Sequence, residues 1–243
     1  MSRQTSVRIL ENTTMHLLDN PIWSALTTQL AHFAQTEERA RRFPPQVTAL
    51  AAVADETPES YASLDRLLSE APAGLFLHRL PEFPPQWSLI RTLPLWQMVF
   101  EDGRTVAPRH AFTPLEKNDA REMLALAELT KPGPFGLRTH ELGNYLGVRE
   151  QGKLIAMAGE RLRVPGFAEI SAVCTHPDHL GHGYATSLIA ELVQRIHTRG
   201  EIPFLHVAEE NERAIALYER LGFRKRHRFQ LAVIQRAKNS AAA

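Results

Sequence analysis

Apolar positions along the chain recur with two periods, and stretches of the two kinds alternate. In the first third, apolar residues with helical spacing follow Asn20-Pro21 and Thr57-Pro58, which are typical helix starts. Short apolar runs between and after them are typical of strands. The pattern predicts helices over 22–33 and 57–68, and strands over 40–43, 47–53 and 74–78. It indicates a small α/β subdomain at 1–86, in which no catalytic constellation is visible.

Prolines near residue 85 mark the join to a longer second part that alternates in the same way. We expect strands over 89–100, 145–149, 153–162, 167–173, 204–207 and 223–235, and helices over 113–129, 184–198 and 211–221. Asp102-Gly103 and Gln151-Gly152 predict tight turns, and the second turn closes a hairpin. Residues 131–141 form a loop rich in glycine and proline. This order predicts a second α/β domain at 87–236, followed by a disordered tail at 237–243.

The stretch 167–186 combines a strand, a glycine loop and a helix, and the rest of the second part is arranged around it. The first turn of a helix has unpaired backbone N–H groups and partial positive charge, so it attracts anions. Gly181 and Gly183 let the backbone turn with positive φ and approach a ligand closely. The hydroxyl of Thr186 adds a further donor. An ordinary turn before a helix is the alternative reading, because a glycine pair alone is a weak signal.

The glycine loop carries a more specific pattern. It resembles the Q/R-x-x-G-x-G/A signature with which the GNAT superfamily of acetyl-CoA-dependent N-acetyltransferases binds the pyrophosphate of coenzyme A. The resemblance implies that the cofactor contacts Leu180, Gly181, His182, Gly183, Tyr184, Ala185 and Thr186. Leu180 departs from the usual Gln or Arg. Because the family's contact is largely main chain, this change weakens a side-chain contribution without removing the binding site.

A second match lies downstream, one helix and one strand later. Residues 211–223 resemble the N-x-x-A-x-x-L/F-Y-x-x-x-G-F element of GNAT enzymes, in particular of their FR47-like branch. Together the two elements cover roughly 88–236. They imply the GNAT fold, a mixed central sheet flanked by helices, with the small α/β subdomain before it. They also imply acetyl-CoA as cosubstrate and acetyl transfer to a primary amine by direct attack in a ternary complex.

Few catalytic side chains are needed, because alignment of the two reactants contributes more than a general base does. We expect Glu169 to be the base, since its strand resembles that of the histone acetyltransferase branch and apolar neighbours would raise its pKa toward neutrality. An exposed strand glutamate is the alternative interpretation, and Glu209 and Glu210 are rival bases. Tyr218 matches the family tyrosine that protonates the coenzyme thiolate, although a tyrosine on an apolar helix face is often a core residue.

The remaining candidates bind rather than react. The resemblance implies that Asn211 bonds the pantetheine arm, a role compatible with capping its helix. The main chains of Val173 and Cys174 would pair with the same arm as if it were an added strand. Cys174 has no recognisable paired base and is expected to be a small buried residue rather than an acyl carrier. His176, His179 and His182 lack further ligand pairs, so we expect no metal site.

Composition narrows the class of protein. With 28 basic and 27 acidic residues the formal net charge is +1, which gives no reason to expect nucleic acid as a partner. One cysteine agrees with a reducing compartment, and the polar first residues and the absence of a long apolar run predict neither export nor a membrane partner. We therefore expect a cytoplasmic enzyme.

The sequence leaves several alternatives open. The protein could be a non-catalytic acyl-CoA-binding regulatory module, with Leu180 as a sign of decay. The acyl donor could also be another thioester such as succinyl-CoA. The acceptor, a small-molecule or peptide amine, is not selected by any residue pattern. The oligomeric state is open too, with a homodimer among the options.

Overall fold

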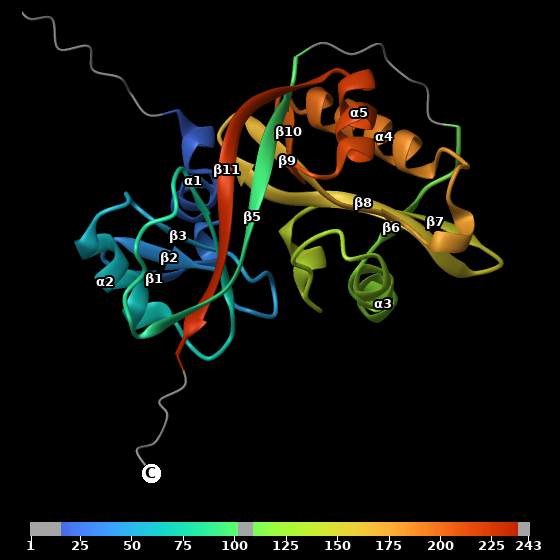
Figure 1. Ribbon diagram of the computed structural model, residues 1–243. Coiled ribbons are helices and arrows are strands. Elements are labelled where there is room, and N and C mark those ends of the chain that lie inside the picture. The colour runs from blue at the N-terminus through green and yellow to red at the C-terminus, as the bar shows by residue number, and fades with distance from the viewer. Residues whose placement is uncertain (1–15, 102–108, 238–243) are drawn as a thin grey trace, which may run out of the picture.

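A computed structural model describes residues 16–101 and 109–237 (Figure 1). Its main feature is an eight-stranded sheet with the order β4-β11-β5-β10-β9-β8-β7-β6. The strands are β4 (Ala73–Leu77), β5 (Trp87–Phe100), β6 (Thr113–Leu115), β7 (Tyr145–Glu150), β8 (Lys153–Val164), β9 (Phe167–Thr175), β10 (Ile202–Ala208) and β11 (Phe223–Arg236). The predicted mixed sheet is confirmed, because β9 and β10 run parallel while their other neighbours run antiparallel.

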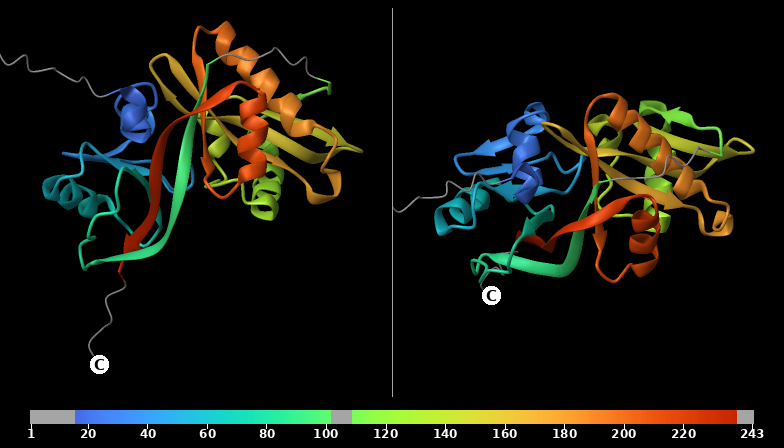
Figure 2. Two further views of the ribbon diagram at one scale, coloured as in Figure 1. Left: turned by 45° about the horizontal axis from the view of Figure 1, so that its top comes forward. Right: turned by 90° about the horizontal axis from the view of Figure 1, so that it is seen from above.

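Helices cover both faces of this sheet (Figures 1 and 2). On one face lie α4 (Tyr184–Thr198) and α5 (Glu212–Arg220), whose apolar residues share a core with β8, β9 and β10. On the other face, α3 (Ala120–Thr130) packs against β7, β8 and β9. Helix α1 (Pro21–Thr27) shares a separate core with Leu162 of β8 and Phe204 of β10. Burial of these apolar faces is the main source of stability.

The first third forms a small sheet, with β1 (Gln35–Glu37), β2 (Ala40–Arg42) and β3 (Ala51–Val53), and the helix α2 (Pro58–Leu67). Its last strand, β4, joins the large sheet by pairing with β11. Leu64 and Leu75 share one core with Ile234, so this unit and the large sheet are packed as one body. The boundary predicted at residue 86 falls between two strands of one sheet, and the division of the chain there stays a prediction.

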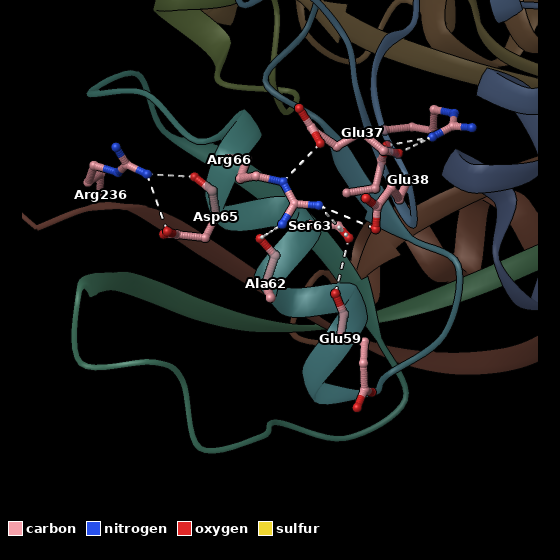
Figure 3. Close-up of polar contacts among 10 residues, drawn as sticks. Glu37, Glu38, Glu59, Ala62, Ser63, Asp65, Arg66 and Arg236 are labelled. Carbon is pink, nitrogen blue, oxygen red and sulfur yellow. Dashed lines mark hydrogen bonds and ion pairs between the residues drawn. The ribbon is translucent and has the colours of Figure 1, made fainter.

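Surface hydrogen bonds and ion pairs link α2 to β1 and β11 (Figure 3). Arg66 pairs with Glu37 of β1 at 2.9 Å, and Arg236 at the end of β11 donates to the Asp65 carbonyl oxygen at 2.7 Å. These side chains are solvent-exposed, where ion pairs contribute little. The helix is therefore held mainly by its buried face.

Three predictions about elements are wrong in their bounds. The helix expected over 22–33 ends at Thr27, the strand expected from residue 47 begins only at Ala51, and the helix expected from Thr113 begins at Ala120. Thr113–Leu115 is the edge strand β6, because Leu115 is buried opposite Tyr145 of β7. The short 3-10 turns are Leu17–Asp19, Ala31–Phe33, Lys117–Asp119, Thr139–Leu142 and Pro177–His179. The turn predicted at Asp102-Gly103 and the tail from residue 238 lie outside the described residues.

Among the helices that the structure describes, none is both long enough and apolar enough to span a lipid bilayer.

Candidate active site

The parallel strands β9 and β10 separate part-way along their length. They are paired at Ile202 with Phe167, Pro203 with Ala168, and Phe204 with Glu169, and no further. Beyond these positions β9 continues through 170–175 and β10 through 205–208, each still paired with its other neighbour. The facing edges therefore present backbone N–H and C=O groups to an opening between the strands, which we call the splay. Such groups need partners when they are buried.

A β-bulge lies in β9 at the splay. Cys174 pairs with Met157 and Ser171 with Gly159, so β9 has one more residue than β8 between these positions. Within the bulge Ala172 has a φ of 52°, a left-handed conformation that is unfavourable for a residue with a Cβ. Bulges of this kind redirect the main chain and are common beside functional sites. Here the bulge turns backbone groups of β9 toward the splay.

The glycine loop continues from the end of β9. Gly181 and Gly183 have φ values of 87° and 79°, and a Cβ built at either residue would meet no atom within 4 Å. Helix α4 starts at Tyr184 with no side-chain cap, so no side chain of the N-cap position satisfies its first N–H groups. Leu180 is 50% exposed. The loop and helix start have the main-chain geometry that anion sites use, and anion binding here stays a prediction.

A segment that the sequence analysis missed lies across this loop. His110 lies with Nε2 3.0 Å from the carbonyl oxygen of His182, and its ring packs on Tyr184 at 4.5 Å between centroids. The N–H of Arg109 donates to the Ser187 hydroxyl at 3.3 Å. These residues precede β6, and no sequence pattern connects them with the glycine loop.

Helix α5 brings two of the predicted residues to the opposite side of the splay. Asn211 caps the helix, because its Oδ1 accepts from the Ala214 N–H at 3.1 Å. Tyr218 packs against the core that contains Leu205 and Val207 of β10. Burial raises the pKa of Tyr218 to about 12, so its hydroxyl is protonated at neutral pH. A protonated hydroxyl can donate a hydrogen bond to a negatively charged atom that arrives beside it.

Glu169 occupies the last paired position before the splay, and its environment differs from the prediction. The side chain is fully buried, and both carboxylate oxygens accept from Arg161, at 2.6 and 2.9 Å. His206 Nδ1 lies 2.7 Å from Oε1. Burial alone would raise the pKa of Glu169, but Arg161 and His206 outweigh it and lower the pKa to about 2. The expected raised pKa is wrong, and so is the alternative of an exposed glutamate.

The neighbours of His206 fix its protonation. Gln97 Oε1 accepts from Arg226 at 2.9 Å, so the amide nitrogen faces the other way and lies 3.1 Å from His206 Nε2. Since an amide NH₂ only donates, Nε2 must accept, and Nδ1–H must donate to Glu169. This is neutral histidine, in agreement with burial lowering the pKa of His206. Glu169 is therefore an ionised carboxylate held by one arginine and one neutral histidine.

The other candidates are poor bases or nucleophiles. Glu209 is exposed and paired with Arg228 at 2.6 Å, and the hydrogen bond from Arg228 lowers its pKa. Glu210 follows it in the turn before α5. Burial raises the pKa of Cys174 to about 11, so the thiolate needed for an acyl intermediate does not form at neutral pH. Val173 is half-buried against the α4 core.

The three loop histidines are not brought together as a metal site. His179 pairs with Glu150 at 2.9 Å, and His176 Nδ1 accepts from the Asp178 N–H at 3.3 Å. Within 16–101 and 109–237, no group of three or more His, Cys, Asp or Glu side chains is arranged to hold a metal ion.

Comparisons with known proteins agree with this geometry. The family model for FR47-like proteins matches residues 145–231. A GNAT-family protein of Novosphingobium aromaticivorans, described as an acetyltransferase, has a solved structure that is 36% identical and covers 92% of this chain and 100% of its own, with a TM-score of 0.84. Together with the splay and the glycine loop, this match defines the class of protein as a CoA-dependent acyltransferase. The chain belongs to the GNAT family of acetyltransferases.

Two further relatives match less of the chain or only its fold. The N-alpha-acetyltransferase RimI of Mycobacterium tuberculosis is 35% identical over 85 residues, which is 34% of this chain and 52% of that protein. The chain thus spans about half the length of that curated relative. A GCN5-related N-acetyltransferase of Kribbella flavida is 16% identical, covers 86% of this chain and 93% of its own, and has a TM-score of 0.58. It shows the shared fold alone.

Removing the charge of Glu169 should destabilise the protein strongly. Glu169→Gln leaves the buried guanidinium of Arg161 without its counter-ion, so we expect the free energy of unfolding to fall by about 3 to 5 kcal/mol in urea denaturation at pH 7. The exposed pair of Arg138 with Glu141, at 2.7 Å, is the matched control, and Glu141→Gln should have little effect. Equal effects of the two variants would contradict the buried ion pair.

The same pair predicts a pH dependence. The pKa of Glu169 in the folded protein is about 2, below its ordinary value of 4.5. The contribution of Glu169 to the free energy of unfolding is therefore complete above pH 4.5 and is lost as the pH falls toward 2. The stability difference between the wild-type protein and Glu169→Gln should therefore shrink over that window. A difference that stays constant down to pH 2 would contradict this assignment.

Proposed function

We propose that this protein transfers an acetyl group from acetyl-CoA to a primary amine, by direct attack of the amine while both substrates are bound. The observation that carries the proposal is the splay, which leads directly to an uncapped helix start with open space above two glycines. A cofactor with an amide-rich arm and a diphosphate at one end fits both features. The arm satisfies the unpaired strand edges, and the diphosphate satisfies the first N–H groups of α4.

The binding residues follow from this fit. Main-chain groups of Val173 and Cys174 would pair with the arm from the side of β9. Asn211 would contact the arm from the start of α5, where its Nδ2 is not used by the cap. The diphosphate would be held by the loop and first turn of α4, comprising Leu180, Gly181, His182, Gly183, Tyr184, Ala185 and Thr186. Acetyl-CoA supplies the activated thioester, and no metal is required for this reaction.

Tyr218 would act as the acid. When the amine attacks the carbonyl carbon, the carbon–sulfur bond breaks and the thiolate needs a proton. The Tyr218 hydroxyl is protonated at neutral pH, lies beside the open part of β10, and forms no hydrogen bond to another described side chain that would hold its proton back. It can give its proton to the thiolate and recover one from solvent.

We assign no side chain to deprotonation of the amine. Glu169 and Glu209 are both held ionised by arginines, so each is a weaker base than an ordinary carboxylate. Glu210 stays a candidate through a water molecule. Loss of the amine proton to water before attack is sufficient for the reaction when alignment provides most of the acceleration.

The acceptor we favour is the α-amino group of a peptide. The support is the relative named N-alpha-acetyltransferase RimI, although the match spans about half of that protein. A small-molecule amine is the other candidate. A cytoplasmic location, the absence of nucleic-acid and membrane partners, and a homodimer stay predictions. No observation favours the non-catalytic alternative.

Turnover can be tested without knowing the acceptor. The purified protein is incubated with acetyl-CoA or succinyl-CoA and a panel of peptides and small amines, and free thiol release is followed. We expect acetyl-CoA-dependent release with at least one α-amine. Binding of acetyl-CoA in calorimetry, without release across a broad panel, would favour the regulatory module instead.

A side chain at the glycine loop should weaken cofactor binding. Gly183→Ala introduces a Cβ at a positive φ and at the surface where the diphosphate would lie, so we expect the Kd of acetyl-CoA to rise at least about tenfold. Gly166→Ala is the matched control, because Gly166 has a φ of 81°, equally open space, and lies in the turn at the opposite end of β9. Similar Kd values for the two variants in calorimetry would argue against the site.

Removal of the Tyr218 hydroxyl should slow the reaction without weakening acetyl-CoA binding. For Tyr218→Phe we expect kcat to fall by about 100-fold or more, with the Kd of acetyl-CoA within about threefold of wild type. Any rate that remains in the variant would come from protonation of the thiolate by solvent. An unchanged kcat in the thiol-release assay would remove Tyr218 from the mechanism.

A further inference from the structure

A second tyrosine, Tyr145 of β7, carries a buried hydroxyl without a partner. The side chain is 2% exposed, and its oxygen makes no hydrogen bond to any group that the structure describes. A buried hydroxyl without a partner is unfavourable, so its presence calls for an explanation. The ring packs with Met123 and Met157 in the α3 core. Phenylalanine could pack there in the same way without burying a hydroxyl that lacks a hydrogen-bond partner.

The ring crosses β8 toward β9. Tyr145 lies opposite Gly159 of β8, which in turn lies opposite Ser171 of β9, so the three residues form one row on the α3 face of the sheet. A Cβ on Gly159 would overlap the Tyr145 ring, which shows that the ring lies flat over this glycine. Phe135 packs edge-on against the ring at 5.9 Å. The glycine and Phe135 together fix the direction of the hydroxyl.

That direction leads to the inner end of the splay. Ser171 is the next residue on this face after Glu169, the last position paired with β10, and it directly precedes the bulge residue Ala172. Charged groups that bear on the Tyr145 hydroxyl include Arg161, Glu169 and Glu160. The row from Tyr145 through Gly159 to Ser171 thus directs the ring toward the place where the two strands begin to separate.

The proposed function places the reactive end of the cofactor at the same point. An arm that enters at the glycine loop and follows β9 backwards passes from Thr175 to Ser171, roughly 13 Å of strand. Its thioester then lies at the inner end of the splay. The thioester carbonyl oxygen gains negative charge during attack by the amine, and an oriented donor in a dry site stabilises that charge.

We propose that the Tyr145 hydroxyl donates a hydrogen bond to the thioester carbonyl oxygen of bound acetyl-CoA, and that Tyr145 is a catalytic residue of this protein. The inference rests on the proposed function. It accounts for the orphan hydroxyl, for the glycine beneath the ring and for the position of the bulge. Burial raises the pKa of Tyr145, which keeps the hydroxyl a donor throughout the reaction. The attacking amine is a poorer acceptor for the hydrogen bond from Tyr145, because its lone pair is used to form the bond to the carbonyl carbon.

The test uses Tyr145→Phe, which removes one oxygen atom and leaves the ring. Carbonyl-labelled acetyl-CoA is bound to the full chain, and the thioester stretching band is recorded by isotope-edited infrared spectroscopy, a measurement that needs no acceptor. We expect the band to lie at lower frequency in the wild-type complex than in solution and to return toward the solution value in the variant. With an accepted amine, kcat should fall by about 100-fold. The Kd of acetyl-CoA should stay within about threefold, and thermal stability should not decrease.

Tyr61→Phe is the matched control. Tyr61 also carries a buried hydroxyl without a described partner, but it lies in the core of the first third, against Trp87. This variant should match the wild-type protein in band position and kcat. A Tyr145→Phe complex with the wild-type band and wild-type kcat would overturn the inference while leaving the acetyltransferase proposal intact. Failure of the wild-type protein to bind acetyl-CoA would overturn both.

Discussion

The parallel ladder between β9 and β10 ends at Glu169 and Phe204, and the rest of the site depends on that interruption. Strand edges inside a sheet normally satisfy each other, so an opening in the middle of the sheet requires a cause. Two features of β9 lie at this point. The bulge at Ala172 interrupts its regular course, and the ion pair of Glu169 with Arg161, extended by His206, occupies the last paired position. The opening is part of the fold itself and leaves backbone groups that an extended ligand could pair with.

This arrangement divides the work between main chain and side chains. In the proposed complex, backbone groups of the splay and of the α4 start would provide the binding surface, so the exposed Leu180 in the signature would not remove it. Few side chains are proposed to take part in the reaction. Two of them, Tyr145 and Tyr218, carry hydroxyls that are protonated at neutral pH. The carboxylate of Glu169 belongs to the scaffold, because its ionised state is stabilised by an arginine that cannot lose its charge. Accurate alignment, more than strong base catalysis, is then the main source of acceleration.

The sequence predicted the parts of the site that depend on local patterns. The glycine loop and the helix from Asn211 could be recognised because each motif lies within one element and its turn. The surroundings of Glu169 could not, since Arg161 comes from the neighbouring strand and His206 from β10, far away in sequence. A signal was present in the adjacent charges Glu160 and Arg161, which follow the apolar run 154–159 of β8 and required buried partners on both faces. The strand β6 was missed for a similar reason, because only the packing of Leu115 against β7 shows it to be extended.

The most direct test of the account is amide hydrogen–deuterium exchange with and without acetyl-CoA. The account predicts that the cofactor slows exchange selectively in three segments, namely 170–175 of β9, 205–208 of β10 and the first turn of α4. Exchange in the remainder of the large sheet should change little, because those strands are already paired. Protection elsewhere, or no change in the two facing strand edges when the cofactor is bound, would contradict the claim that the splay receives its arm.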